Sequence, residues 1–113
     1  MRLPFVERDY GAPVRDVEIR LPPDADCCEI GRIIDQAIAQ AGLTVTLRDE
    51  LKRFPGCIHW HAKNGRQSGT LEITLWPQQH RAWFTIQDGR AADWIDAKMT
   101  LLQEAIGQGL DDL

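Results

Sequence analysis

The chain has 113 residues, of which 43% are hydrophobic and 27% are charged, and its formal net charge is −4. These values are typical of one soluble globular domain, and they exclude a disordered, collagen-like or disulfide-rich chain. No apolar run approaches the roughly 18 residues that a membrane-spanning helix needs, so we expect no membrane association. The first nine residues lack the apolar segment of a signal peptide, which favours a cytoplasmic protein.

The cysteines and the charge distribution exclude further classes of protein. Cys27, Cys28 and Cys57 include no Cys-x-x-Cys pair, which predicts neither a disulfide framework nor a zinc finger and suits a reducing cytoplasm. Residues 43–90 carry seven basic and four acidic side chains within an acidic chain. This balance argues against general nucleic-acid binding and leaves room for a small anionic ligand.

The N-terminal part of the chain predicts an arm, a strand and a helix. Apolar residues do not recur at a helix or strand period over residues 1–13. We interpret this segment as an arm that packs Phe5 and Val6 on the rest of the domain. Alternation over residues 17–21 predicts a half-buried strand. Asp26 then caps a helix that Gly42 ends. Its apolar stripe comprises Ile30, Ile33, Ile34, Ala37 and Ile38.

The rest of the chain predicts four more strands and a second helix. The strands cover residues 43–48, 57–63, 70–76 and 81–87, and residues 49–53 either continue the first of them or form one helical turn. The helix covers residues 91–106, and we expect Gly107 and Gly109 to end it. We therefore predict one domain over residues 14–107, with a C-terminal tail at residues 108–113.

The element order is strand, helix, four strands, helix, which predicts an α+β fold. Each helix has a single apolar stripe, so both helices should cover the same face of a five-stranded antiparallel sheet. This order resembles the TATA-box-binding-protein-like architecture, a resemblance of fold that implies no particular function.

The opposite face of that sheet, here called the free face, contains the candidate functional residues. Side chains alternate along a strand, and Trp60, Ile73 and Phe84 should turn toward the helices because burying them stabilises the fold. Their neighbours then share the free face, and matching the faces allows the cross-strand pairs His61–Glu72, His59–Thr74 and Cys57–Trp76. A register shifted by two residues would change these pairs but not the face. The candidate ligand-binding residues are Cys57, His59, His61, Glu72, Thr74, Trp76, Arg81 and Trp83.

The first interpretation of the free face is binding without chemistry. Two tryptophans beside two histidines are costly to leave in water, so we expect a small ligand, a protein partner, a second copy of the chain or the N-terminal arm to cover them. Trp76, Trp83 and Arg81 could stack on a planar or anionic ligand, or weakly on single-stranded nucleic acid. Aromatic residues and arginine are also enriched at interface cores, which favours a homodimer.

The second interpretation is a metal site. His59 and His61 are two residues apart on one strand, so both imidazoles project the same way, and Glu72 supplies a carboxylate. Imidazole and carboxylate are zinc ligands, and a three-ligand zinc site supports hydrolysis. The pair His61–Glu72 could alternatively move protons without a metal. Because no nucleophile motif accompanies these residues, we expect a binding protein, with a zinc-dependent hydrolase-like site as the alternative.

Overall fold

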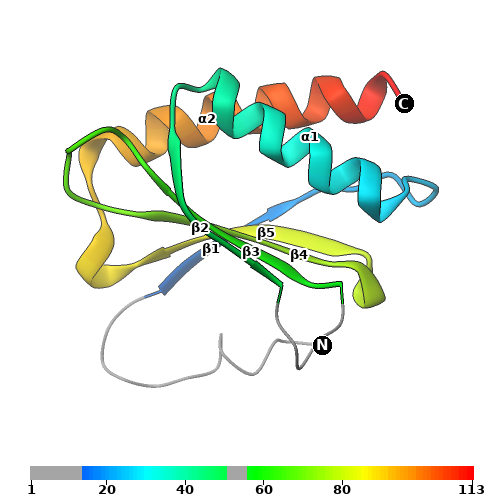
Figure 1. Ribbon diagram of the computed structural model, residues 1–113, viewed down its shortest axis with the longest axis horizontal. Helices are drawn as coiled ribbons and strands as arrows, with labels where there is room; N and C mark the ends of the chain where they lie inside the picture. The colour runs from blue at the N-terminus through cyan, green and yellow to red at the C-terminus, as the bar shows by residue number, and fades with distance from the viewer. Residues whose placement is uncertain (1–13, 51–55) are drawn as a thin grey trace.

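The computed structural model describes residues 14–50 and 56–113, so the predicted arm and residues 51–53 lie outside the described part. A five-stranded antiparallel sheet has the order β1-β5-β4-β3-β2, and both helices pack on one of its faces (Figure 1). The α+β fold class and the element order are therefore confirmed. In chain order the elements are β1 (Val14–Ile19), α1 (Cys27–Gln40), β2 (Thr44–Glu50), β3 (Ile58–Lys63), β4 (Leu71–Trp76), β5 (Arg81–Gln87) and α2 (Asp93–Asp111).

Local sequence explains helix α1 and the strand that follows it. Asp26 accepts a hydrogen bond from the backbone N–H of Glu29, which satisfies one of the unpaired donors at the start of α1. The predicted apolar stripe is buried against the sheet. Gly42 has a φ of +75°, the left-handed conformation that glycine adopts without strain when it ends a helix. Strand β2 continues to Glu50, so Asp49 and Glu50 belong to the strand.

The prediction that Gly107 and Gly109 end the second helix is wrong. Helix α2 continues to Asp111, so residues 108–111, predicted as part of a tail, are helical. A Cβ at Gly109 would lie only 2.8 Å from Cγ2 of Ile33, so glycine here permits close packing of α2 on α1. Leu110 is buried in the core, and this burial offsets the cost of about 1 kcal/mol for a glycine inside a helix.

The core lies between the two helices and the sheet. Trp60, Ile73 and Phe84 are fully buried there, as the alternation predicts. Trp60 also donates from its indole Nε1 to Asp35 of α1 at 2.8 Å, and Arg48 of β2 binds the same carboxylate with two hydrogen bonds. These contacts fix α1 over β3 and β2.

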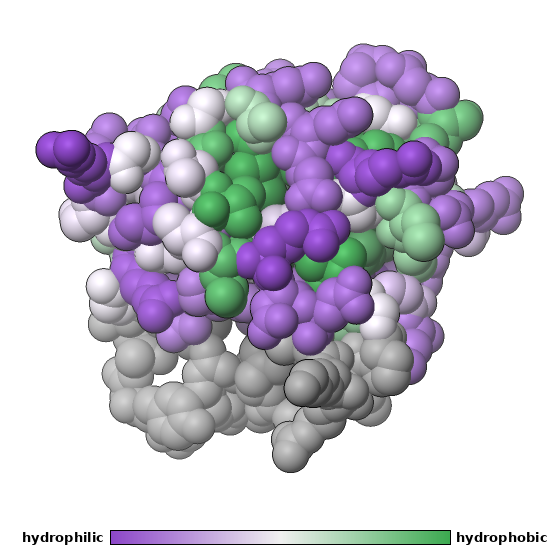
Figure 2. Space-filling view, in the orientation of Figure 1, coloured by the Kyte–Doolittle hydropathy of each residue, from purple (hydrophilic) through white to green (hydrophobic). Residues whose placement is uncertain are grey.

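The side of the molecule seen in Figure 2 is mostly polar. Figure 2 shows hydrophilic residues over most of one side, with hydrophobic residues gathered where the helix layer meets the sheet. No helix among the described residues is long and apolar enough to cross a membrane.

Candidate metal centre

The register of the sheet brings the predicted free-face residues together. His61 pairs with Glu72 and His59 pairs with Thr74 between β3 and β4, as the sequence predicts. Between β4 and β5, Thr74 pairs with Trp83. Cys57 lies one residue before β3, so its predicted pairing with Trp76 is not part of the strand ladder.

Three side chains from β3 and β4 converge on the free face. The Nε2 atoms of His59 and His61 lie 3.2 Å apart. Oε1 of Glu72 lies 3.3 Å from Nε2 of His59 and 3.9 Å from Nε2 of His61. These three residues form the one group of potential metal ligands found within residues 14–50 and 56–113. We call them the triad.

The triad atoms have the spacing of ligands around one ion. A triangle with sides of 3.2, 3.3 and 3.9 Å has a point about 2.0 Å from all three corners, which matches Zn–N and Zn–O bond lengths of about 2.0–2.2 Å. An ion with slightly longer bonds would lie just outside the plane of the triangle, as tetrahedral coordination requires. The side chains therefore need little movement to hold a metal.

A hydrogen bond orients the first imidazole of the triad. Nδ1 of His59 lies 2.8 Å from Oγ1 of Thr74, its partner across the strands. When Nδ1 carries the ring proton and donates it to this hydroxyl, Nε2 keeps its lone pair for a metal. This arrangement, in which an outer partner fixes the tautomer of a histidine, is characteristic of metal sites.

The carboxylate of the triad is held from its other side. Oε2 of Glu72 accepts hydrogen bonds from Nε2 of Gln87 at 2.9 Å and from Nη1 of Arg90 at 3.2 Å. Gln87 ends β5, and Arg90 ends the short 3₁₀ turn η3 (Asp88–Arg90) that follows it. The two donors leave Oε1 turned toward the imidazoles.

Burial and the neighbouring groups shift the pKa values of two triad residues, Glu72 and His61. Burial by itself raises the pKa of Glu72, but the hydrogen bond with His59 and the charges of His61, His59 and Arg90 together lower it below its usual value. Burial is also the largest influence on His61 and lowers its pKa, and the opposing attraction of Glu72 does not reverse the shift. An ionised carboxylate and a neutral imidazole are the forms that bind metal ions.

The remaining predicted ligand-binding residues lie outside the triad. Trp76 and Trp83 are 7% and 2% exposed, so little of either ring is open to solvent. Arg81 donates two hydrogen bonds to Glu18 on the edge strand β1. Cys57 is buried, and that burial raises the pKa of its thiol. The two tryptophan rings are therefore less open to solvent than the imidazoles of the triad, because the His59 and His61 side chains are 21% and 23% exposed.

Sequence reasoning missed the residues that support the triad. Gln87 could have been found, because alternation along β5 places it on the free face beside Glu72. Alternation could not have indicated Arg90, because this residue follows the strand. It contacts Glu72 only because the turn η3 brings it back toward the sheet. His80, the histidine outside the triad, has its Nε2 atom 2.7 Å from the backbone oxygen of Pro22.

Comparison with known proteins does not indicate a function for the triad. No protein-family model matches the chain, and no curated protein or solved structure shows significant similarity to it. The function of the triad is therefore argued from its own geometry.

Proposed function

We propose that this protein binds one divalent transition-metal ion of the zinc class through His59, His61 and Glu72. The observation that carries the proposal is the convergence of Nε2, Nε2 and Oε1 around a point about 2.0 Å from each, a zinc bond length. Two imidazoles and one carboxylate suit zinc, cobalt or iron, whereas Mg²⁺ and Ca²⁺ prefer oxygen ligands.

The number of protein ligands indicates what such an ion would do. Structural zinc sites are closed by four protein ligands, whereas reactive sites have three and leave a position for water or substrate. The triad belongs to the second type. When bound, such an ion lowers the pKa of coordinated water and polarises a ligand oxygen, which is the chemistry of a hydrolase-like site.

The two tryptophans of the free face, Trp76 and Trp83, are poorly placed to stack on a ligand. A stacked base or planar ligand needs an accessible ring face, and Trp76 and Trp83 are almost entirely buried. We therefore favour the triad over Trp76, Trp83 and Arg81 as the place where a small ligand binds.

The free state of Cys27, Cys28 and Cys57 supports a cytoplasmic location. The homodimer stays a prediction, tested by light scattering at several protein concentrations.

Metal analysis of protein without a polyhistidine tag tests the proposal. The protein is stripped with a chelator, equilibrated with Zn²⁺ or Co²⁺, freed of excess metal and analysed for metal content. We expect close to one ion per chain, and a visible absorption band from Co²⁺ that reports its coordination. Mg²⁺ at the same concentration should not be retained. Metal content far below one ion per chain for both Zn²⁺ and Co²⁺ would refute the proposal.

Variants then assign the binding to the triad. His59→Ala and Glu72→Gln should each weaken Zn²⁺ binding by more than about 100-fold, since even outer partners of a metal site contribute 10–100-fold. His80→Asn is the matched control, because His80 is the third histidine of the chain and lies outside the triad. Asparagine also tolerates the left-handed conformation of His80, whose φ is +50°. Circular dichroism confirms folding, and unchanged affinity in a folded His59→Ala variant would contradict the assignment.

A further inference from the structure

Two basic side chains lie beside the triad at one end of the free face. Lys63 follows His61 by two residues on β3, so it shares the free face. Its Nζ lies 3.4 Å from Oγ1 of Thr70, and the backbone N–H of Thr70 donates to the backbone oxygen of Arg90 at 3.0 Å. Lys63 and Arg90 therefore both contact Thr70, which precedes Glu72 by two residues.

Arg90 is placed to serve both the triad and an external anion. One of its nitrogens donates to Oε2 of Glu72, while its side chain remains 46% exposed. A guanidinium has five N–H donors in a rigid plane, so it can hold the carboxylate on one edge and bind an oxyanion on another. Glu72, at 5% side-chain exposure, is not accessible in the same way.

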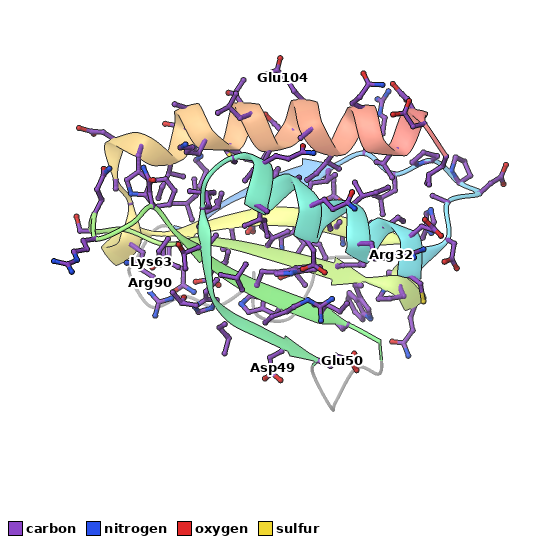
Figure 3. The ribbon with its side chains drawn as sticks, turned by 45° about the horizontal axis from the view of Figure 1, so that its top comes forward. Arg32, Asp49, Glu50, Lys63, Arg90 and Glu104 are labelled. Atoms are coloured by element: carbon purple, nitrogen blue, oxygen red, sulfur yellow. The ribbon has the colours of Figure 1, made fainter. Side chains whose placement is uncertain are left out.

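The charges across the free face are separated. Asp49 on β2 pairs with His59 and shares the free face with it, on the side of the triad away from Lys63, whereas Glu50 pairs with Ile58 and therefore belongs to the helix-covered face. Figure 3 shows Lys63 and Arg90 together at one end of the sheet, away from Asp49 and Glu50. With a divalent ion in the triad, the ion, Arg90 and Lys63 together outweigh the carboxylates of the free face near the triad, which are Glu72, Asp49 and Asp16. An anion is therefore attracted to this end of the site.

We infer that the metal centre takes a small phosphate-type oxyanion, either inorganic phosphate or a phosphate monoester. One phosphate oxygen occupies the open position on the ion, and the others accept hydrogen bonds from Arg90 and Lys63. Arginine binds phosphate through parallel N–H donors and lysine binds it as a point charge, so the pair suits a tetrahedral dianion. The inference rests on the proposed metal binding and specifies the ligand class of the same site.

Titration of Co²⁺-loaded protein with inorganic phosphate and, separately, with phenyl phosphate tests the inference. Binding is followed by calorimetry and by the Co²⁺ absorption band, which should shift when an oxygen ligand enters the coordination sphere. We expect saturable binding at one site for at least one of the two probes. Equal affinities would indicate recognition of the phosphate group alone, and preference for phenyl phosphate would identify the monoester as the ligand.

Lys63→Met provides the matched variant, because Lys63 lies outside the triad. It should weaken phosphate binding by about tenfold or more while leaving Co²⁺ affinity nearly unchanged. Arg32→Met removes one positive charge from helix α1, on the other layer of the fold, and should change neither affinity (Figure 3). Protein that binds Co²⁺ but neither phosphate probe would overturn this inference and leave the metal proposal standing. Equal phosphate binding by Lys63→Met and wild type would also overturn it.

Discussion

On strands β4 and β5 the two faces of the sheet are buried to a similar degree, but polar residues are buried only on the free face. On the helix-covered face, Ile73 and Phe84 are fully buried among other apolar residues. On the free face, Glu72, Thr74 and Thr85 are also buried, although each carries polar atoms. The same strands, β4 and β5, supply both sets, and the two faces differ only in which alternate residues they take.

The difference shows that burial has two origins in this sheet. Apolar side chains gain free energy when they leave water, so the covered face stabilises the fold. Polar side chains lose free energy unless hydrogen bonds replace the lost water, and on the free face those bonds are present. Thr85 donates to Asp16, and Glu72 accepts from Gln87 and Arg90. The free face also buries Trp76 and Trp83, which stabilise the fold, whereas its hydrogen-bonded carboxylate contributes little to stability and points to binding.

Substitutions at two adjacent residues of β5 provide the strongest test of this comparison. Phe84→Ala should lower the free energy of unfolding by about 3–5 kcal/mol, because it leaves a cavity in the core. Thr85→Val should lower it by about 1 kcal/mol, the typical net value of one hydrogen bond. Urea unfolding of both variants beside the wild type measures the difference. Comparable losses would show that the free face is a second stabilising core.

Thr74→Val separates metal binding from stability. Valine matches the shape of threonine and removes only the hydroxyl that contacts Nδ1 of His59. We expect Zn²⁺ affinity to fall by about 10–100-fold, as for other outer partners of metal ligands. The free energy of unfolding of the metal-free protein should change by less than about 1.5 kcal/mol. If Zn²⁺ affinity stays the same while the free energy of unfolding falls, the Thr74 hydroxyl stabilises the sheet and does not position His59 for metal binding.

Thiol labelling gives the mildest test of how closed the free face is. Cys28 is exposed, whereas Cys57 is buried and its pKa is raised, which lowers its thiolate fraction. A disulfide reagent should therefore modify Cys28 first in the native protein and Cys57 only after partial unfolding. Peptide mapping by mass spectrometry identifies the labelled residue. Early labelling of Cys57 would mean that this part of the free face opens readily.

The alternation of apolar and polar residues predicted the sheet well. It assigned Trp60, Ile73 and Phe84 to the covered face, and of the registers that let like faces meet, the structure has the one that pairs His61 with Glu72 and His59 with Thr74. These predictions succeed because side-chain direction in a strand is a property of the local backbone. A shift of one residue would move every side chain to the wrong face.

The prediction of the second helix failed where packing outweighs local preference. Glycine normally ends helices, yet Gly109 lies inside α2 because its missing side chain allows contact with Ile33 of α1. No rule based on neighbouring residues indicates this contact, because Ile33 and Gly109 come from distant parts of the chain.

The sequence by itself determined the element order, the two faces and the residue types that meet on the free face, because these follow from the backbone repeat of strands and helices. Only the tertiary structure decided that two imidazoles and a carboxylate approach within bonding distance of one point. It also decided that Arg90 returns from η3 to hold Glu72. Such distances depend on cross-strand packing, side-chain conformation and turn geometry together, and a pattern along one chain contains none of these.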